Sequence, residues 1–249
     1  MAYVFKERNP PPEWSEFKAR APHACLVPLF FLSWAADWAA YGLAKWPLVE
    51  LLEYLGSFSI LFGVIFYFAG ASDRLKQKHY QAWQVINTAE GKGGNGGRID
   101  ALQELNKDRI SLIGVNVAGA YLEGLRLENA EARRANFNSA DLRRASFKQA
   151  SLEDAALGWA NLRGADLRAC NLADSQLDDA DLTGASLAGA DLSQASLERA
   201  DLTGADLDHV RNWETIKSIR GANIFGIENA PEGFAAWATK MGAVETKPN

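Results

Sequence analysis

The sequence predicts an all-β solenoid joined to an N-terminal α-helical membrane anchor. Three observations lead to this fold class. From residue 110 to residue 207 an apolar or small side chain returns at every fifth position, in twenty copies without an insertion. Two apolar segments, each close to the roughly 20 residues that cross a bilayer as a helix, precede that region. No set of residues has the spacing of a catalytic site.

The composition indicates a folded, acidic protein. Its 249 residues carry a formal net charge of −5 and are 48% hydrophobic, so we expect one or two packed domains. The acidic balance gives no reason to expect nucleic-acid binding, for which a basic face is the usual footprint. Two distant cysteines, Cys25 and Cys170, favour a reducing compartment over a disulfide framework. Because His23, His79 and His209 are also scattered, we expect no metal site.

A predicted anchor at residues 24–71 follows a polar leader at residues 1–23. Its second apolar segment, residues 51–71, carries no charge after Tyr54, so we expect it to cross the membrane as a helix. In the whole anchor, the residues expected to contact lipid are Trp34, Trp38, Trp46, Phe58, Ile60, Phe62, Ile65 and Phe66.

The first apolar segment, residues 24–44, has two readings. It contains Pro28 and Asp37, and an aspartate near the bilayer centre costs on the order of 2.5 to 3.5 kcal/mol. The segment is therefore either the first arm of a hairpin that turns at residues 45–47, or a helix lying in the interface. A signal peptide is a weaker reading, because a second apolar segment follows.

Basic residues favour the hairpin. They flank the pair of segments on both sides, and Lys45 alone lies between them. Since cytoplasmic loops are enriched in lysine and arginine, both ends of the anchor are expected in the cytoplasm. We therefore expect an inner-membrane protein whose solenoid lies on the cytoplasmic side. The flanking basic residues are Lys6, Arg8, Lys18, Arg20, Arg74, Lys76 and Lys78.

Three short segments connect the anchor to the repeats. Residues 72–89 place Leu75, His79, Ala82 and Ile86 on one helical face, which predicts a juxtamembrane helix. Residues 90–98 contain five glycines and predict a flexible linker, since they lack the spacing of a phosphate-binding loop. Residues 99–109 are expected to form a short helix that caps the first coil.

The five-residue period predicts a four-sided coil. On an α-helix, five residues advance about 140 degrees net, which would scatter the leucines around the axis. In a flat strand, odd steps alternate between faces. A chain that turns a corner every five residues can point each leucine inward. Four sides then make a coil of 20 residues, and residues 110–207 make about five coils stacked at about 4.8 Å, with open ends that need caps.

The triplets Ala140-Asp141-Leu142, Ala165-Asp166-Leu167 and Ala200-Asp201-Leu202 resemble the A(D/N)LXX signature of the pentapeptide-repeat family. The resemblance covers about 100 residues and implies a right-handed quadrilateral parallel β-helix. Some relatives in this family resemble duplex DNA in shape and charge and bind type II topoisomerases.

Two features depart from the repeat. Ala132 occupies a position held elsewhere by larger apolar residues, which predicts a thin spot in the core near the second coil. Residues 208–249 do not continue the five-residue period and are expected to cap the open end, with Trp213, Phe234 and Trp237 as the covering apolar groups.

Charge is unevenly distributed along the repeats. Residues 126–168 contain eight basic and six acidic residues, whereas residues 169–210 contain nine acidic residues and only Arg199 as a base. Residues 20 apart should stack, which predicts a negative face on the distal coils. The candidate protein-binding residues on it are Asp174, Asp178, Asp181, Asp191, Asp201 and Asp206.

The leading hypothesis is a membrane-anchored scaffold or protein-binding module without cofactor, metal or enzymatic activity. Its expected partners are membrane lipid and a protein, with self-association also compatible and nucleic acid not expected. One alternative is inhibition or protection of a topoisomerase by DNA mimicry, which the anchor and the basic half disfavour. Another is an accessory role in membrane transport, which rests on Asp37, Glu50 and Glu53 in or beside the anchor.

Overall fold

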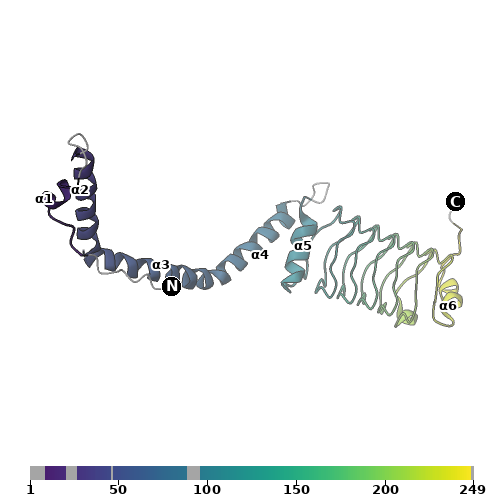
Figure 1. The fold of residues 1–249 in the computed structure, drawn as a ribbon. Helices are drawn as coiled ribbons and strands as arrows, with labels where there is room; N and C mark the ends of the chain where they lie inside the picture. The colour runs from purple at the N-terminus through teal and green to yellow at the C-terminus, as the bar shows by residue number, and fades with distance from the viewer. Residues whose placement is uncertain (1–8, 21–26, 46, 89–95, 248–249) are drawn as a thin grey trace. The chain divides into compact units, whose positions relative to one another are not determined.

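The computed structural model describes residues 9–20, 27–45, 47–88 and 96–247. The chain divides into two compact units, Met1–Asp73 and Arg74–Asn249, which are described separately below. Among the described residues, the regular elements of the first unit are helices, and the second unit contains a stack of coils with helices at its two ends (Figure 1).

Three helices make up most of the first unit: α1 (Trp14–Lys18), α2 (Val27–Ala44) and α3 (Pro47–Ala69). The sequence did not predict α1, which packs on α2 through aromatic rings. Trp14 lies 5.2 Å from Phe31 and 5.5 Å from Trp34, centroid to centroid. Helix α2 ends and α3 begins at the predicted turn, and the hairpin itself stays a prediction.

Many of the residues expected to contact lipid are exposed in this unit. On α3, Phe58, Ile60, Phe62, Ile65 and Phe66 are all more than half exposed. By length and composition, none of the described helices alone is sufficient for a membrane span. A pair bent by 43°, Phe58–Ala69 with Ala71–Thr88, satisfies the same criterion together.

Two tryptophans of the predicted anchor lie on α2, and a third is outside the described residues. Trp34 is half-buried and donates its Nε1 hydrogen to the carbonyl of Pro12 at 2.8 Å. Trp38 is 39% exposed and contacts Tyr41 edge to face. Trp46 lies outside the described residues.

The second unit begins with two helices that close the first coil. Helix α4 (Ala71–Thr88) matches the predicted juxtamembrane helix, and α5 (Arg98–Lys107) matches the predicted cap. The face of α4 is buried through Ala82 and Ile86, and that of α5 through Leu102 and Leu105, all in one core cluster with the coils. Of the predicted linker, residues 89–95 lie outside the described part.

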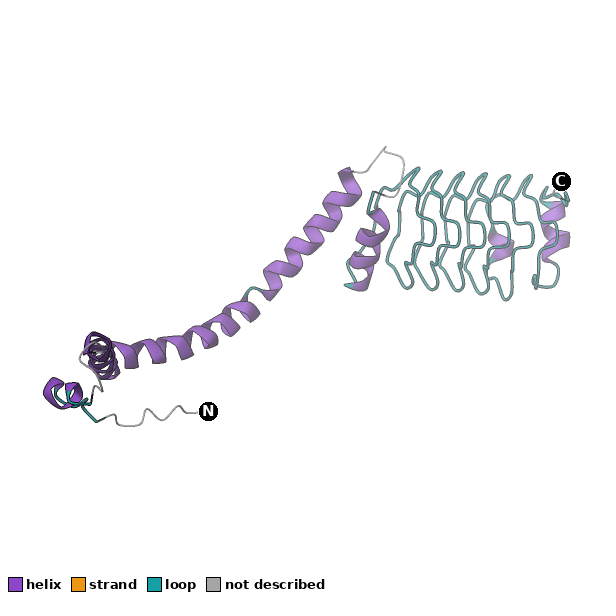
Figure 2. Cartoon of the chain, turned by 45° about the horizontal axis from the view of Figure 1, so that its top comes forward, coloured by secondary structure: helices purple, strands orange, loops and turns teal. Residues whose placement is uncertain are grey.

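The coils that follow confirm the 20-residue period. On each side, a parallel bridge joins one residue to the residue 20 positions later, as in Tyr121 with Asp141 and Asp141 with Asn161. Each side contributes a single bridge residue between two turns, so the described coils contain isolated bridges but no strand (Figure 2). The parallel β-ladder expected of an all-β solenoid is therefore present, whereas the described coils do not form the expected β-strands. The right-handed sense stays a prediction.

We number the coils and sides by their inward residues. Coils 1 to 5 begin at residues 110, 130, 150, 170 and 190. In coil 3, the inward residue is Leu152 on the first side, Leu157 on the second, Leu162 on the third and Leu167 on the fourth. Corners take the number of the side that they follow, so residues 153–154 lie at the first corner and residues 158–159 at the second.

The interior is a continuous stack of apolar side chains. All twenty inward residues are at most 1% exposed. Coil 2 shows why Ala132 fits. Phe137 and Phe147 lie on opposite sides of this coil, and their rings meet at 5.5 Å. Two larger residues beside one smaller residue conserve the volume of the coil, which argues against the predicted thin spot.

The ladder extends beyond the predicted boundary at residue 208. Arg211, Ser218, Asn223 and Glu228 bridge to coil 5, and two extra residues enter before Ser218. Residues 208–228 thus form a sixth, irregular turn. The predicted aromatic cap is confirmed after it: Phe234, on α6 (Phe234–Lys240), is 1% exposed and lies 5.6 Å from Trp213, which heads the short helix η2 (Trp213–Thr215).

Candidate interaction surface of the solenoid

Every corner of the solenoid is built from the same tight turn. In coil 1, the amide of Ala120 donates to the carbonyl of Val117 at 3.2 Å, and Gly119 between them has φ of 63°. The same position has positive φ in each repeat from residue 109 to residue 209. This left-handed conformation favours glycine, yet most of these positions carry a side chain.

The residue before each inward position also has a structural task. The ladder pairs three of the five amides in a repeat and the turn pairs a fourth. The amide left over, two residues after the bridge residue, needs a side-chain acceptor. Asp141 accepts from Arg143 at 3.4 Å, Asn161 from Arg163 at 3.3 Å. This Asx turn is why aspartate and asparagine recur before the leucine.

The six candidate aspartates do not form a single face. Asp174 lies at the first corner and Asp178 at the second, while Asp191 is on the first side and Asp206 on the fourth. Only Asp181 and Asp201 lie together, joined by a parallel bridge on the third side. The prediction that this pair stacks is confirmed, whereas the prediction of one acidic face is wrong.

Four of the candidates hold the backbone. Asp181 accepts the amide of Thr183 at 3.0 Å, and Asp201 accepts the amide of Thr203 at 3.0 Å. Asp191 and Asp206 make the same contact with Ser193 and Asp208. Asp206 also accepts from Asn229 at 2.9 Å, and this hydrogen bond holds the pKa of Asp206 below its usual value.

The two corner aspartates differ from these four. Asp178 accepts the hydroxyl of Ser196 and the amide of Glu198, which lies one coil further along. Asp174 is exposed and lines a shallow hollow of about 290 Å³ with Asp154, Gln176 and Gln194. The backbone amide of Asp174 donates to the carbonyl of Ser193 at 2.8 Å, whereas its carboxylate has no hydrogen-bond or ion-pair partner among the described residues.

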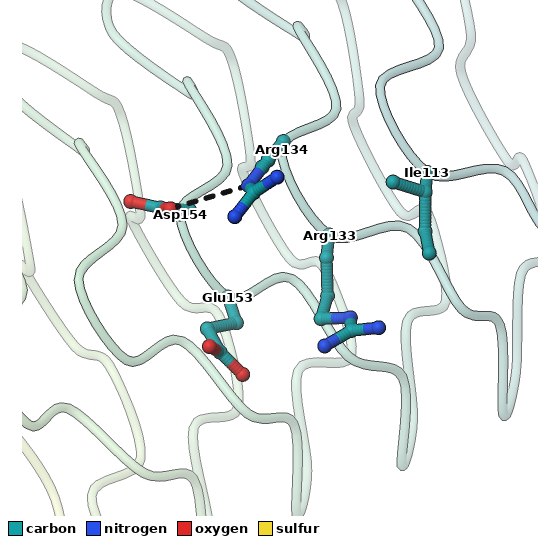
Figure 3. A pocket seen from close by; sticks show the side chains of 5 residues that line it. All are labelled: Ile113, Arg133, Arg134, Glu153 and Asp154. Carbon is teal, nitrogen blue, oxygen red and sulfur yellow. Dashed lines mark ion pairs between the residues drawn. The ribbon is translucent and has the colours of Figure 1, made fainter.

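Charge varies by coil along the axis. Coil 2 has five basic residues against two acidic ones, whereas coils 4 and 5 together have nine acidic residues and one arginine. At the first corner, Arg133 and Arg134 of coil 2 lie beside Glu153 and Asp154 of coil 3 (Figure 3). Arg134 is 75% exposed and lies 3.5 Å from Asp154.

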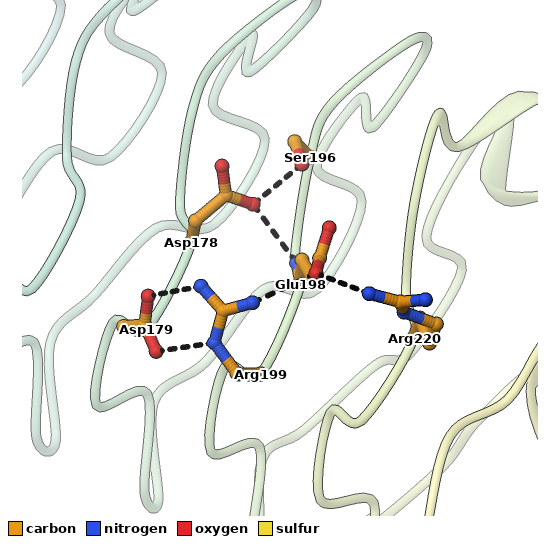
Figure 4. A network of polar contacts seen from close by, with 6 residues as sticks. All are labelled: Asp178, Asp179, Ser196, Glu198, Arg199 and Arg220. Atoms are coloured by element: carbon orange, nitrogen blue, oxygen red, sulfur yellow. Dashed lines mark hydrogen bonds and ion pairs between the residues drawn. The ribbon is translucent and has the colours of Figure 1, made fainter.

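A network of charged groups occupies the second corner of coils 4 and 5. Arg199 donates to both oxygens of Asp179, at 2.8 and 2.7 Å, and to Glu198 at 2.7 Å (Figure 4). Glu198 also accepts from Arg220 at 3.2 Å. The hydrogen bonds from Arg199 lower the pKa of Asp179. The network joins three successive turns of the solenoid.

Sequence reasoning missed Trp159. It lies at the second corner of coil 3, in the left-handed position with φ of 54°, and is 65% exposed. A large aromatic side chain gains no burial there and strains the backbone. The signal was available, because Trp159 is the one tryptophan among residues 110–207 and it stands where glycine recurs.

Residues that often carry chemistry are dispersed in the described structure. No group of three or more His, Cys, Asp or Glu side chains in the described ranges could hold a metal ion. Cys170 is buried, and burial raises the pKa of its thiol to about 12. His79 pairs with Asp108 at 2.8 Å, at the contact between α4 and the end of α5.

Two family models match the repeats. A model described as a pentapeptide repeat region matches residues 130–207, and one described as pentapeptide repeats in eight copies matches residues 110–149. No curated protein sequence matches this chain significantly.

Several solved structures of pentapeptide repeat proteins are similar to this chain. HetL from the cyanobacterium Nostoc sp. strain PCC 7120, involved in heterocyst differentiation regulation, is 30% identical over 49% of this chain, with a TM-score of 0.29. That match spans 58% of HetL. A protein of the Arabidopsis thaliana thylakoid lumen is 29% identical over 52% of this chain and 88% of its own, with a TM-score of 0.31. QnrB1, a plasmid-mediated fluoroquinolone resistance protein, is 20% identical over 50% of this chain and 64% of its own, with a TM-score of 0.27.

The 20-residue ladder, the turn at every fifth residue and both family models coincide over residues 110–207. Residues 110–207 of this chain are therefore a pentapeptide-repeat region.

Proposed function

We propose that this chain is a membrane-tethered, non-catalytic module that presents the acidic coils 4 and 5 to a basic protein partner. The observation that carries the proposal is the charge distribution: nine acidic residues against one arginine over residues 169–210. A concentrated charge of one sign accelerates the encounter with an oppositely charged protein and disfavours other partners.

The tether is supported by the exposed apolar surface of α3. Ile60 and Phe66 are each 72% exposed, and Phe68 is 70% exposed. Soluble monomers seldom expose contiguous apolar patches of this kind, whereas a bilayer would cover them. The basic residues at both ends of the anchor favour a cytoplasmic solenoid.

Carbonate extraction tests the tether directly. Membranes from cells that express the full chain are washed at alkaline pH and sedimented. We expect the chain in the pellet together with a known integral protein. Its release with a peripheral marker would remove the membrane from the proposal while leaving the binding function open.

The binding function needs variants that remove charge without removing the turn. Asparagine offers the same side-chain oxygen to the backbone as aspartate. We therefore expect the substitutions Asp181→Asn, Asp191→Asn, Asp201→Asn and Asp206→Asn, combined, to preserve the fold and weaken partner capture. The measurement is crosslinking in intact membranes, followed by quantification of each partner that the unmodified chain captures.

The matched control changes the same structural position outside the acidic coils. Asp141→Asn and Asp166→Asn together should retain the captured partners. Equal capture by the quadruple variant and the unmodified chain, with equal thermal stability, would contradict a binding role for the acidic coils.

Mimicry of duplex DNA, with a topoisomerase as the partner, is less well supported. Coils 4 and 5 extend about 10 Å along the axis, at about 4.8 Å per coil. One turn of duplex DNA extends about 34 Å. The basic coil 2 would interrupt any longer acidic track. A transport role is supported only by Asp37, which is exposed on α2, since the side chains of Glu50 and Glu53 lie outside the described residues.

A further inference from the structure

The second side differs from the other three in its bridge residues, which form the floor of that side. Its bridge residues in coils 1 to 5 are all uncharged: Asn116, Asn136, Ala156, Gln176 and Ser196. Each other side includes at least one charged bridge residue, such as Glu131, Asp181 or Arg126. Covering the second side therefore removes the fewest charges from water, which makes it the side with the lowest desolvation cost.

The middle coil of this side carries its apolar groups. Coil 3 contributes Ala156 to the floor and Trp159 to the edge, with Gly158 beside the tryptophan. A side chain at Gly158 would approach Asn138 Oδ1 to 3.2 Å and the carbonyl of Asp178 to 3.5 Å, so the backbone there lies close to both neighbouring coils. An exposed tryptophan beside an uncharged floor is the type of residue that often forms an interface hot spot.

The first corner supplies complementary groups on either side of coil 3. One coil before it, Arg133 and Arg134 project with exposed guanidinium groups. One coil after it, the carboxylate of Asp174 has no described partner and lines the hollow of about 290 Å³, where the other charged groups are Asp154 and Lys217. The projecting groups and the hollow are therefore equidistant from the same coil, on the same edge.

From this arrangement, we infer that the second side binds the second side of another copy of this chain, in an antiparallel dimer. A twofold axis that crosses this side at coil 3 brings coil 2 of one copy against coil 4 of the other. Arg134 then meets the hollow that contains Asp174 of the second copy. Trp159 meets Trp159 of the second copy on the axis. Two such contacts with Asp174 form, because the interface is isologous.

Charge on the axis itself is balanced by the same arginine. Asp154 would lie opposite Asp154 of the second copy, which is unfavourable alone. Arg134 already lies 3.5 Å from Asp154 in its own chain. In the dimer, it stands between that carboxylate and Asp174 of the second copy. At the second corner, Asn138 and Ser139 would meet Asp178 and Asp179 of the second copy as hydrogen-bond donors to acceptors.

The size of the side predicts a weak dimer. Five coils extend about 24 Å and a side is about 10 Å across, so with its edges each copy buries on the order of 300 to 400 Å². A stable dimer usually buries about 800 Å² per partner. We therefore expect association that depends on concentration in solution and is strengthened when chains share a membrane, where their effective concentration is higher.

Sedimentation velocity of the full chain in detergent micelles tests the charged contacts. Arg134→Asp and Asp174→Arg should each weaken dimerisation at least tenfold, and the two substitutions in one chain should restore it. Arg144→Asp, which removes an equally exposed arginine from the third corner, should leave dimerisation unchanged. A double variant as weak as either single variant, or association that none of these substitutions alters, would overturn the inference.

Trp159→Gly separates association from folding. Glycine relieves the left-handed backbone, so the unfolding temperature should rise while the dimer weakens at least tenfold. An unchanged dimer would contradict the placement of Trp159 on the axis.

Disulfide crosslinking gives a second measurement of the geometry. In a Cys25→Ser background, Trp159→Cys should form covalent dimers under mild oxidation. His209→Cys occupies the same turn position at the fourth corner and should not, and Cys170 is buried. Crosslinking at His209→Cys equal to that at Trp159→Cys would reject this side as the interface. None of these readouts depends on the membrane or on a basic partner, so they stand apart from the proposed function.

Discussion

At the scale of single residues, the corner position that requires positive φ is filled inconsistently. Gly189 has φ of 68° and Ala169, one coil earlier at the same corner, has φ of 54°. A Cβ added at Gly189 would meet only the backbone of Ala169, at 3.9 Å, so space does not distinguish the two. The backbone conformation alone should therefore set their relative stability.

We expect opposite effects from exchanging these two residues. Ala169→Gly should stabilise the solenoid by about 0.5 to 1 kcal/mol, because glycine adopts the left-handed conformation without a steric penalty. Gly189→Ala should destabilise it by about 1 kcal/mol. Urea unfolding followed by circular dichroism measures both. Effects of the same sign would show that side-chain burial, not backbone strain, governs this corner.

The aspartate before each leucine should matter for its oxygen more than for its charge. Asp201→Ala leaves the amide of Thr203 without its acceptor and should cost about 1 to 3 kcal/mol. Asp201→Asn retains an acceptor and should cost much less. The free energies of unfolding of the two variants decide the matter, and equal losses would refute the Asx turn as the reason for this residue.

Several of these residue roles could have been read from the sequence. Dividing each position by the period of 20 places the six candidate aspartates around the whole coil, with only Asp181 and Asp201 aligned. The pairing of their carboxylates with backbone amides could not be read in this way, because it depends on which amide the turn leaves unpaired. Surface charge and backbone capping look identical in a one-dimensional pattern.

At the scale of elements, the junction between α4 and α5 combines apolar packing with charge. Ala82 and Ile86 are buried, while Lys78 pairs with Glu104 and His79 with Asp108. The hydrogen bond from His79 lowers the pKa of Asp108. The periodicity of α4 correctly predicted that Ala82 and Ile86 are buried, whereas Leu75 on the same predicted face is 46% exposed. The partner of His79 could not be predicted because it lies outside α4.

This junction should make stability depend on acid pH. Because the pKa of Asp108 is lower in the folded state, its contribution is complete above the unfolded value of about 3.9 and is lost as the pH falls through the folded value. As the pH falls from about 5 to about 3, the Asp108→Asn variant should therefore lose less free energy of unfolding than the unmodified chain. Urea midpoints across this range are the measurement. An identical acid response in both proteins would contradict the pairing.

The packing of coil 2 predicts that a loss of volume at Phe147 compensates for added volume at Ala132. Ala132→Leu adds volume beside the contact between Phe137 and Phe147 and should destabilise the chain by about 1 to 3 kcal/mol. Adding Phe147→Leu should recover part of that loss, since the total volume returns toward the original. Thermal unfolding of the single and double variants gives the comparison. Two losses that simply add would contradict volume compensation between Ala132 and Phe147.

At the scale of the whole molecule, the period determined most of the architecture. A repeat of five without insertions left one economical way to bury twenty apolar residues, so the four-sided stack followed from the sequence. The absence of strands did not, since it depends on turns that take two of every five residues. The sixth turn was missed because its two extra residues interrupt the five-residue period on which the prediction depended.

The uniform length of the sides also limits how such a chain can change through insertion and deletion. Loss of one five-residue unit from coil 1 would rotate every later residue by a quarter turn relative to the N-terminal helices, and the uncharged floor would end against a different neighbour. Loss of four units together would shorten the stack by one coil and leave the direction that each side faces unchanged. Length variation in steps of 20 residues is therefore the kind that this molecule can tolerate without reassigning its surfaces.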